Sequence, residues 1–384
     1  MSKQIKLKGK DIFDGYRLLG ENKVLVLTGD GTVESILDKD LAGEDIREVA
    51  GILCPGFVNT HCHLELSHMA GKVPEKTGLP AFLTTVMEHR TPPSPEAMAQ
   101  AMAAAEAAMW QSGIAAVGDI ANTTATLDIK QQGRLFYHSF IETMGFVEAA
   151  AANRFAHSKE VYQQFNAING TMHHTSIVPH APYSVSKALF ELLASVHPNT
   201  PVSIHNQECR AENELYIDKT GAFVDFYRHF GILINGFAPS GHTSLQTYLP
   251  YMQPGKLLLV HNTFTTEQDI LFAQAQHPDV YWCFCPQANL YIEQTLPDIS
   301  CFRRHHCNIT LGTDSLASNH QLSIWAEIQT IQQHFPDIPL EELLQWATLN
   351  GAHALNIVDT YGSFEKGKKP GVVALHHLHS ERII

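Results

Sequence analysis

Short apolar runs separated by turn residues occupy the first fifty residues of the chain. The runs QIKLKG, KVLVLTG and TVESIL are rich in β-type residues, and Gly and Asp stand between them. This pattern is typical of small antiparallel strands. It predicts strands and no helix up to about residue 52.

Beyond that point, short apolar runs alternate with longer segments of helical periodicity. Helices are predicted between the runs, among them residues 95–113, 186–196, 211–231 and 266–276. The eight apolar runs are LCPGFVNTHCH (53–63), GIAAVGDI (113–120), RLFYHSFIE (134–142), TSIVPHA (175–181), PVSIHN (201–206), KLLLVHN (256–262), VYWCFCP (280–286) and NITLGTD (308–314). Strands that alternate with helices predict a parallel sheet.

Eight such repeats are what a (β/α)₈ barrel requires. The C-terminal segment GSFEKGKKPGVVAL returns to β-type residues, and we expect it to pair with the N-terminal strands. We therefore predict an α/β fold. It comprises a (β/α)₈ TIM barrel at residues 53–358 and a small β-sandwich formed by residues 1–52 and 359–384.

Composition narrows the class of protein. The net charge of −13, with no basic block, gives little electrostatic support for binding nucleic acid. The N-terminus lacks the apolar core of a signal peptide, and no segment reaches the roughly 18 apolar residues of a membrane helix. Seven cysteines in 384 residues fit a reducing compartment. We expect a soluble, cytoplasmic protein with no membrane partner, and a homodimer as the common default.

Histidine and aspartate stand at the ends of several predicted strands. The first run ends in His61-Cys62-His63, whose alternate side chains point to one side of a strand. The fifth, sixth and eighth runs end in His205, His261 and Asp314. A pair of histidines can arise by chance in a chain with 23 of them, but their recurrence at four strand ends is poorly explained by chance. Imidazoles with one carboxylate suit Zn²⁺ or Fe²⁺ better than Mg²⁺ or Ca²⁺.

The strings PGFVNTHCHLELS, SIHNQE, VHNTF and LGTDSLASN resemble the amidohydrolase superfamily, in its cytosine-deaminase-like and chlorohydrolase-like branch, over nearly the whole chain. The resemblance implies that four residues are metal ligands, namely His61, His63, His205 and Asp314. It also implies that Glu208 is the proton shuttle and that His261 orients the attacking water or the substrate.

The fourth predicted strand bears on the number of metal ions. Binuclear members of the superfamily carry a carboxylated lysine at its end, whereas this chain has His180 there, in the string PHAPY. The resemblance therefore implies one catalytic divalent metal ion, with Zn²⁺ as the first choice and Fe²⁺ as the alternative. A bound cation of this kind lowers the pKa of water to about 7.

Two carboxylates then have separate tasks. Asp314 can accept a proton from the water, and Glu208 can protonate a ring nitrogen and later the leaving group. This division of labour fits hydrolytic deamination of a heterocycle. It fits cyclic-amide hydrolysis less well, because the His-x-x-Glu spacing resembles the deaminase side of the family.

The string HLELS resembles aminodeoxyfutalosine deaminases of the alternative menaquinone route. The expected substrate is a small adenine-type nucleoside substituted at C5′, with 6-amino-6-deoxyfutalosine first. Adenosine, methylthioadenosine and S-adenosylhomocysteine stay open as alternatives, and so do guanine, cytosine, triazine and imidazolone rings. A non-catalytic barrel scaffold is the alternative from another class of protein.

Substrate-binding residues are expected on the loops around the metal site. Adenosine-type deaminases of this branch keep a Glu for the ribose hydroxyls near the position of Glu88, and Glu142, His180 and Asn289 follow predicted strands. Four arginines are candidates for a substrate carboxylate, with a solvated surface charge as the alternative for each: Arg90, Arg134, Arg154 and Arg210.

Other suggestive pairs are expected to have no catalytic role. Cys283 and Cys285 lack a second pair at zinc-ligand spacing, so we expect them to pack in a buried strand. The pairs His173-His174, His305-His306 and His376-His377 flank strands or lie in the tail, and we expect them on the surface. No glycine-rich phosphate or dinucleotide loop is present.

Overall fold

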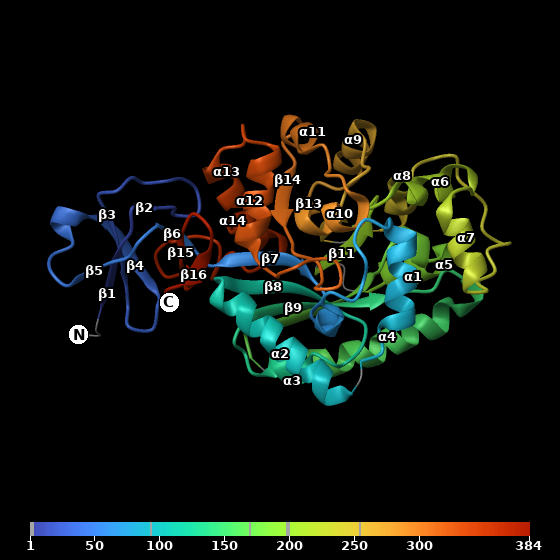
Figure 1. Ribbon diagram of the computed structural model, residues 1–384, viewed down its shortest axis with the longest axis horizontal. Coiled ribbons are helices and arrows are strands. Elements are labelled where there is room, and N and C mark those ends of the chain that lie inside the picture. Colours follow the sequence, from blue (N-terminus) through green and yellow to red (C-terminus); the bar gives the residue numbers. More distant parts are fainter. Residues whose placement is uncertain (1–3, 93, 169, 197–199, 253–254) are drawn as a thin grey trace.

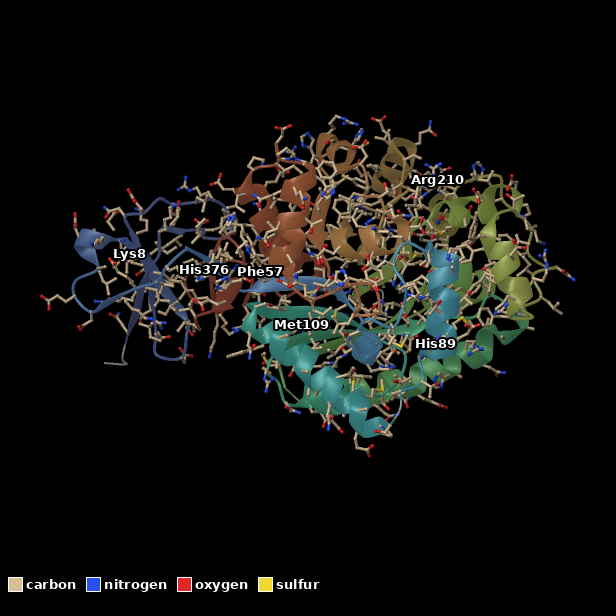
Figure 2. The ribbon with its side chains drawn as sticks, viewed as in Figure 1. Lys8, Phe57, His89, Met109, Arg210 and His376 are labelled. Atoms are coloured by element: carbon tan, nitrogen blue, oxygen red, sulfur yellow. The ribbon has the colours of Figure 1, made fainter. Side chains whose placement is uncertain are left out.

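The computed structural model describes residues 4–92, 94–168, 170–196, 200–252 and 255–384. A small β-rich part lies at one end of the molecule, and a larger part of parallel strands and helices makes up the rest (Figure 1). Phe57 lies at the junction of the two parts (Figure 2). Residues 1–3 of the predicted sandwich lie outside the described residues.

Two four-stranded sheets form the β-rich part. They have the orders β4-β3-β1-β5 and β16-β15-β6-β2. The strands are β1 (Ile5–Lys8), β2 (Asp11–Ile12), β3 (Lys23–Leu27), β4 (Val33–Asp38), β5 (Ile46–Glu48), β6 (Ile52–Pro55), β15 (Val372–Leu375) and β16 (Ser380–Arg382). β15 pairs antiparallel with β6, with Val373 opposite Cys54. The C-terminal segment therefore returns to the N-terminal strands, as the sequence predicts, and Leu7, Leu25 and Val372 share one buried cluster.

Eight parallel strands make up the sheets of the larger part within the described residues. The first sheet has the order β10-β9-β8-β7 and the second β11-β12-β13-β14. The strands are β7 (Phe57–Cys62), β8 (Ile114–Ala121), β9 (Phe136–Thr143), β10 (His173–Pro179), β11 (Pro201–Asn206), β12 (Lys256–His261), β13 (Val280–Phe284) and β14 (Asn308–Leu311). Each of the eight predicted runs overlaps one of these strands, and β8, β9 and β10 extend one or two residues beyond their runs.

The first predicted run is not a single strand. It divides into β6, which pairs with the small sheet, and β7, which pairs with β8. The break falls at Gly56, where a Cβ atom would lie 2.4 Å from the backbone oxygen of Pro370 and 2.6 Å from the Cβ of Ala115. Only glycine fits where these segments approach so closely, and there the chain passes from the small part to the large one.

Backbone hydrogen bonds join the two parallel sheets at their carboxyl ends. On one side, the N–H of His205 donates to the carbonyl oxygen of His180 at 3.0 Å. On the other, the N–H groups of Thr313 and Asp314 donate to the carbonyl oxygen of His61 at 3.0 and 3.1 Å. The strand ends of both sheets therefore meet around one region.

Helices cover the outside of the parallel strands (Figure 1). They are α1 (Leu79–His89), α2 (Pro95–Gln111), α3 (Leu127–Gln131), α4 (Ala151–Asn166), α5 (Lys187–Ala194), α6 (Arg210–Asp218), α7 (Ala222–His229), α8 (Ser244–Tyr248), α9 (Glu267–Gln276), α10 (Pro286–Glu293), α11 (Ile299–Arg304), α12 (Ile324–His334), α13 (Leu340–Ala347) and α14 (Leu349–Ala354). In the described part of the chain, none of them combines the length and the apolar character needed to cross a membrane.

The prediction of one helix over residues 211–231 is wrong. The chain forms α6 and α7 there, and Lys219 between them adopts a left-handed conformation with φ of 60°. Gly221 follows with φ of 83°, and helix α7 begins at the next residue. A left-handed residue ends a helix because it turns the backbone out of the helical path.

Helix α14 packs directly on β7, the strand that carries the first candidate ligands. A Cβ atom at Gly351 would lie 2.8 Å from the Cβ of Val58 and 2.9 Å from its Cγ1. These distances are shorter than ordinary van der Waals contacts, and the Val58 side chain is fully buried. The absence of a side chain at Gly351 therefore sets the spacing between helix and strand.

We predict that Gly351→Ala destabilises the protein by about 1–3 kcal/mol, because an added methyl group overpacks a closed contact. Gly236→Ala is the control, since a Cβ atom there meets nothing within 4 Å. Urea unfolding monitored by circular dichroism measures both. Equal midpoints for the two variants would contradict the close packing of α14 on β7.

Candidate metal centre

Four side chains converge where the parallel strands end. His61 lies in β7 and His63 just after it, His205 lies in β11, and Asp314 follows β14. The Nε2 atom of His63 is 3.1 Å from that of His61 and 3.2 Å from that of His205. The Oδ1 atom of Asp314 is 3.4 Å from His63 Nε2 and 3.6 Å from His61 Nε2. All four side chains are buried.

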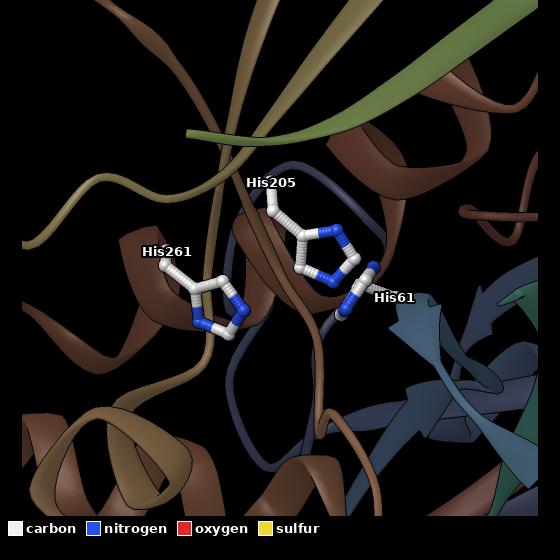
Figure 3. A group of neighbouring side chains, drawn as sticks. All are labelled: His61, His205 and His261. Atoms are coloured by element: carbon white, nitrogen blue, oxygen red, sulfur yellow. The ribbon is translucent and has the colours of Figure 1, made fainter. Parts of the chain in front are cut away.

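Hydrogen bonds behind the rings turn nitrogen lone pairs toward the centre. His205 Nδ1 donates to the backbone oxygen of His180 at 2.8 Å, and His261 Nδ1 donates to Asn289 Oδ1 at 2.9 Å. A neutral imidazole that donates through Nδ1 keeps a lone pair on Nε2. Figure 3 shows the rings of His61, His205 and His261 turned toward one another. His261 Nε2 is buried and has no hydrogen-bond partner among the described residues.

The donor set fits one divalent cation. Ligands bound to Zn²⁺ at about 2.0–2.1 Å in a tetrahedral arrangement are separated by about 3.3–3.4 Å. The observed separations of 3.1–3.6 Å bracket that value. Three imidazoles and a carboxylate are also the ligand types that Zn²⁺ and Fe²⁺ accept. His61, His63, His205 and Asp314 would hold the ion.

The protonation states suit cation binding. Burial, together with the neighbouring His61, lowers the pKa of His63 to about 3, so this ring is neutral at physiological pH. Burial alone would raise the pKa of Asp314, but the hydrogen bond to His61 and the adjacent His63 and His261 hold it below its usual range. Neutral rings and an ionised carboxylate are the forms that bind metals.

The pKa of Glu208 is shifted in the opposite direction from that of Asp314. It is buried beside the centre, with Oε1 3.6 Å from His261 Nε2. Burial, and then the negative charge of Asp314, raise the pKa of Glu208 well above its ordinary value. The site therefore holds one carboxyl group with a lowered pKa and one with a raised pKa, and general acid–base chemistry uses such a pairing.

A cavity of about 460 Å³ opens from this centre. Its walls come from α1, the segment after β9, and α7, and they are mostly apolar, including Phe82, Met144, Phe146 and Phe226. Arg90 and Arg154 also line it. A pocket of this size and character is typical of small-molecule sites.

The predicted substrate residues divide into two groups. Glu142 and His180 line the cavity, and burial raises the pKa of Glu142 well above its usual range. Glu88 and Asn289 do not line it. Glu88 lies on the exposed side of α1, 3.4 Å from His229, and Asn289 bonds to His261 instead.

The candidate arginines divide in the same way. Arg90 and Arg154 lie in the cavity wall, whereas Arg134 pairs with Glu106 at 3.3 Å. Arg210 lies against the ring of Phe264, near α6 and away from the small sheets (Figure 2). Spacing in the sequence does not separate these cases, since Arg134 begins the third apolar run and yet pairs with Glu106 outside the cavity.

Sequence reasoning missed Glu65 and Asn122. Both line the cavity, and Glu65 accepts hydrogen bonds from the N–H groups of Asn122 and Thr123 at 3.2 and 3.3 Å. The available signal was position: Glu65 follows His63 by two residues, and Asn122 follows β8 directly.

The cysteine and histidine pairs that were expected to have no catalytic role differ in where the structure places them. Cys283 and Cys285 lie in a buried cluster with Val260 and Ala288, which agrees with packing. The expectation that His173 is a surface residue is wrong, because His173 is buried and its Nε2 is 2.9 Å from Ser139 Oγ. Its partner in the sequence, His174, is exposed. Alternation along β10 therefore turns one histidine inward.

Fold and site together define a class of protein: an α/β fold of TIM-barrel type with candidate metal ligands gathered at the carboxyl ends of parallel strands. Residues 52–380 match the model of the Amidohydrolase family, and the chain belongs to this family. It is a hydrolase that acts on C–N bonds.

Curated relatives are distant but cover most of the chain. An adenosine deaminase of Helicobacter pylori is 23% identical over 349 residues, which span 86% of this chain and 84% of the relative. An aminodeoxyfutalosine deaminase of Nitratiruptor is 25% identical over 301 residues, spanning 78% of this chain and 72% of the relative. The solved structure of Helicobacter pylori aminofutalosine deaminase in complex with methylthio-coformycin has a TM-score of 0.82 and 21% identity, covering 97% and 93% of the two chains.

One buried carboxyl group behind the site gives a pH-dependent stability. Glu212 Oε1 accepts hydrogen bonds from Gln207 N at 2.9 Å and Ser244 Oγ at 2.5 Å. Burial raises the pKa of Glu212 from 4.5 to about 7. Between these values the folded protein holds a proton that the unfolded chain has lost. Stability therefore falls as pH rises through this window and levels off above it.

We predict that Glu212→Gln, which cannot ionise and keeps an acceptor oxygen, removes this part of the pH dependence. Urea unfolding of both proteins from about pH 5 to about pH 8 measures it. The stability of the native protein relative to the variant should decline up to about pH 7. Parallel curves would show that Glu212 is already ionised in the folded protein at pH 5.

Proposed function

We propose that the protein is a metal-dependent aminohydrolase that removes the 6-amino group of an adenine-type nucleoside, with 6-amino-6-deoxyfutalosine as the first candidate substrate. The observation that carries the proposal is the gathering of His61, His63, His205, His261 and Asp314 in overlapping groups of three, together with the raised pKa of Glu208, at the wall of one cavity. The names of the two curated relatives support the same reaction.

The proposal includes the architecture that holds the site. The two parallel sheets would form one closed (β/α)₈ barrel, and the N- and C-terminal segments would form a separate sandwich. The boundary predicted at residue 52 would move to Pro55, because β6 (Ile52–Pro55) pairs with β15 in the small sheet. The hydrogen bonds of the His61 carbonyl oxygen to Thr313 and Asp314, and of His205 to His180, support closure.

Zn²⁺ is the proposed metal ion, with Fe²⁺ as the alternative. A divalent cation at this centre supplies Lewis-acid activation of water at neutral pH. Asp314 takes a proton from the attacking water, and His261, held by Asn289, directs its Nε2 lone pair toward the same region. Glu208 delivers a proton to the ring nitrogen and then to the departing amine. Overall, a C–O bond forms, the C–N bond breaks, and ammonia leaves.

The cavity favours a substrate with an acidic, largely apolar substituent. Arg90 and Arg154 are exposed residues that line the apolar cavity, and within the described residues their guanidinium groups form no ion pair and no hydrogen bond. Burial raises the pKa values of Glu65 and Glu142, and the charge of Arg90 acts on both carboxyl groups to lower them. An unpaired guanidinium in such a wall is suited to a carboxylate. Adenosine and methylthioadenosine carry no carboxylate, whereas 6-amino-6-deoxyfutalosine carries one on an aromatic ring at its C5′ side.

S-Adenosylhomocysteine is the second candidate, because it also bears a carboxylate. Its ammonium group would need an anionic partner, and the apolar wall formed by Phe82, Phe146 and Phe226 provides none there. Guanine, cytosine and triazines are smaller and leave the arginines unused. A non-catalytic scaffold would have no need of the complete ligand set.

We predict that Glu208→Gln lowers turnover by at least about 10²-fold while metal content stays near that of the native protein, because Glu208 transfers protons and is not a ligand. Ammonia release and metal analysis on the same preparation measure both quantities. Asp314→Asn is the comparison, and it should lose both metal and rate. Near-normal turnover of the Glu208 variant would contradict its role.

We predict that Arg154→Gln raises KM for 6-amino-6-deoxyfutalosine by about 10-fold or more, because a charge-assisted hydrogen bond contributes about 1.5–3 kcal/mol. Its KM for methylthioadenosine should stay unchanged. Arg134→Gln is the control, since Arg134 pairs with Glu106 outside the cavity. Ammonia release from a panel that includes both nucleosides, S-adenosylhomocysteine, guanine and cytosine makes the measurement. Preference for a substrate without a carboxylate would overturn the proposed substrate and keep the reaction class.

A further inference from the structure

Among the described residues, Lys130 is the one lysine that is buried. It lies on α3, and its side chain is fully shielded from solvent. Its Nζ atom is 2.6 Å from Asp119 Oδ2 and donates to Ser139 Oγ at 2.8 Å. The rings of Phe165 and Tyr137 lie 4.8 and 5.3 Å from the same atom. Burying an ammonium group costs free energy, and only an ion pair of good geometry with further hydrogen bonds offsets that cost. The contacts of Lys130 with Asp119 and Ser139 therefore hold its side chain in one position.

Asp119 uses its second oxygen for a different purpose. Its Oδ1 atom accepts a hydrogen bond from the backbone N–H of Leu64 at 2.8 Å. Leu64 begins a 3₁₀ helix, Leu64–Met69, whose preceding residue is His63. The first N–H groups of such a helix lack partners within it, and His63 provides no side-chain cap. Asp119 therefore caps this helix from a neighbouring strand.

The peptide group that Asp119 holds is the one that joins His63 to Leu64. β7 leaves its regular register with β8 between Asn59 and Cys62, and Cys62 lies opposite Asp119. Within the described residues the pairing of β7 with β8 ends at Cys62 and does not extend to His63, whose backbone has turned to φ of −119° and ψ of 79°. The Asp119–Leu64 bond replaces ladder bonds at this point.

We propose that Asp119 and Lys130 are a positioning pair: Asp119 fixes the peptide after His63, Lys130 fixes the Asp119 carboxylate, and together they hold the His63 ring in the geometry that binds the metal ion. This inference rests on the proposed function, because it takes His63 as a ligand. Asp119 and Lys130 act through the backbone of Leu64 and touch neither metal nor substrate. Groups that orient metal ligands in this way affect affinity by about 10–100-fold.

The test separates the hydrogen bond to Leu64 from the buried charge pair. Asp119→Asn with Lys130→Met removes both charges and keeps an acceptor oxygen for the Leu64 N–H. Asp119→Leu with Lys130→Met removes both charges and the acceptor. Each double variant avoids a lone buried charge, so the two proteins differ in the capping bond alone. The dissociation constant for Zn²⁺ is measured on metal-stripped protein by competition with a chelator, alongside thermal unfolding of the same samples.

We expect the Leu/Met variant to bind Zn²⁺ about 10–100-fold more weakly than the native protein. The Asn/Met variant, which keeps the capping bond and loses the Lys130 anchor, should have an affinity between the two. An Asn/Met variant that binds as tightly as the native protein would overturn the role of Lys130. Equal affinities in the two variants, whether both native-like or both weak, would overturn the role of the capping bond. If a double variant fails to fold, Asp119→Asn and Asp119→Ala compared in the presence of Lys130 make the same contrast.

Two controls keep this inference distinct from the proposed function. Glu106→Gln changes another buried carboxylate, whose partners are Tyr137 and Arg134, and should leave Zn²⁺ affinity unchanged. Native protein that binds no Zn²⁺ would overturn the metal-dependent function and this inference together. Native protein that binds Zn²⁺ tightly but releases no ammonia from any nucleoside would overturn the function, while the affinities of the variants still decide the positioning role.

Discussion

Donor atoms with lone pairs repel one another, and at the ends of its parallel strands this protein holds His63 Nε2 within 3.1–3.4 Å of donor atoms of His61, His205 and Asp314. Such a cluster persists only where the surrounding structure is rigid enough to resist that repulsion or where a cation offsets it. Here the restraint is the backbone itself. The carbonyl oxygen of His61 accepts two N–H groups from the Thr313-Asp314 segment, so ligands more than 250 positions apart in the chain are tied together by main-chain bonds. The geometry of the site is therefore a consequence of how the two sheets meet.

Groups behind the ligands then decide what each donor can do. His205 and His261 donate backward through Nδ1, which leaves Nε2 free to face the centre. Ser318 donates to Asp314 Oδ2 at 2.5 Å, so Oδ1 is the oxygen turned toward the histidines. Within the described residues the Glu208 carboxyl accepts no hydrogen bond, and burial raises its pKa. The pKa values of the two carboxyl groups are therefore shifted in opposite directions by their surroundings, which is the physical basis for assigning them different roles.

The sequence predicted the strands and the centre because both follow from local pattern. Apolar runs mark buried parallel strands, and a His or Asp that directly follows such a run must lie at the carboxyl edge of the sheet. That reasoning predicted that these strand ends meet, and the structure brings His61 together with His205 and His261, and also with His63 and Asp314. It failed at Gly56, because β6 and β7 read as one apolar run and only the approach of Pro370 and Ala115 divides them. It failed at Lys219 because a left-handed helix end at a lysine has no sequence signal comparable to glycine.

The substrate cavity was far less predictable, since its walls come from α1, the segment after β9, and α7, which no local pattern connects. Glu88 and Arg90 illustrate the difficulty. They are two residues apart near the end of α1, yet Glu88 faces solvent and Arg90 lines the cavity. A helix turns by about 100° per residue, so an alignment error of one or two positions exchanges a binding residue for a surface one.

The position at which a related enzyme keeps a ribose-binding Glu therefore does not carry over to Glu88. Glu65 and Glu142 line the cavity instead, Glu65 from the 3₁₀ helix that follows β7 and Glu142 from the end of β9. Residues anchored by the strands keep their direction when loops change length. For this reason the sequence pattern predicts which residues gather at the strand ends, whereas it does not predict which residues line the substrate cavity.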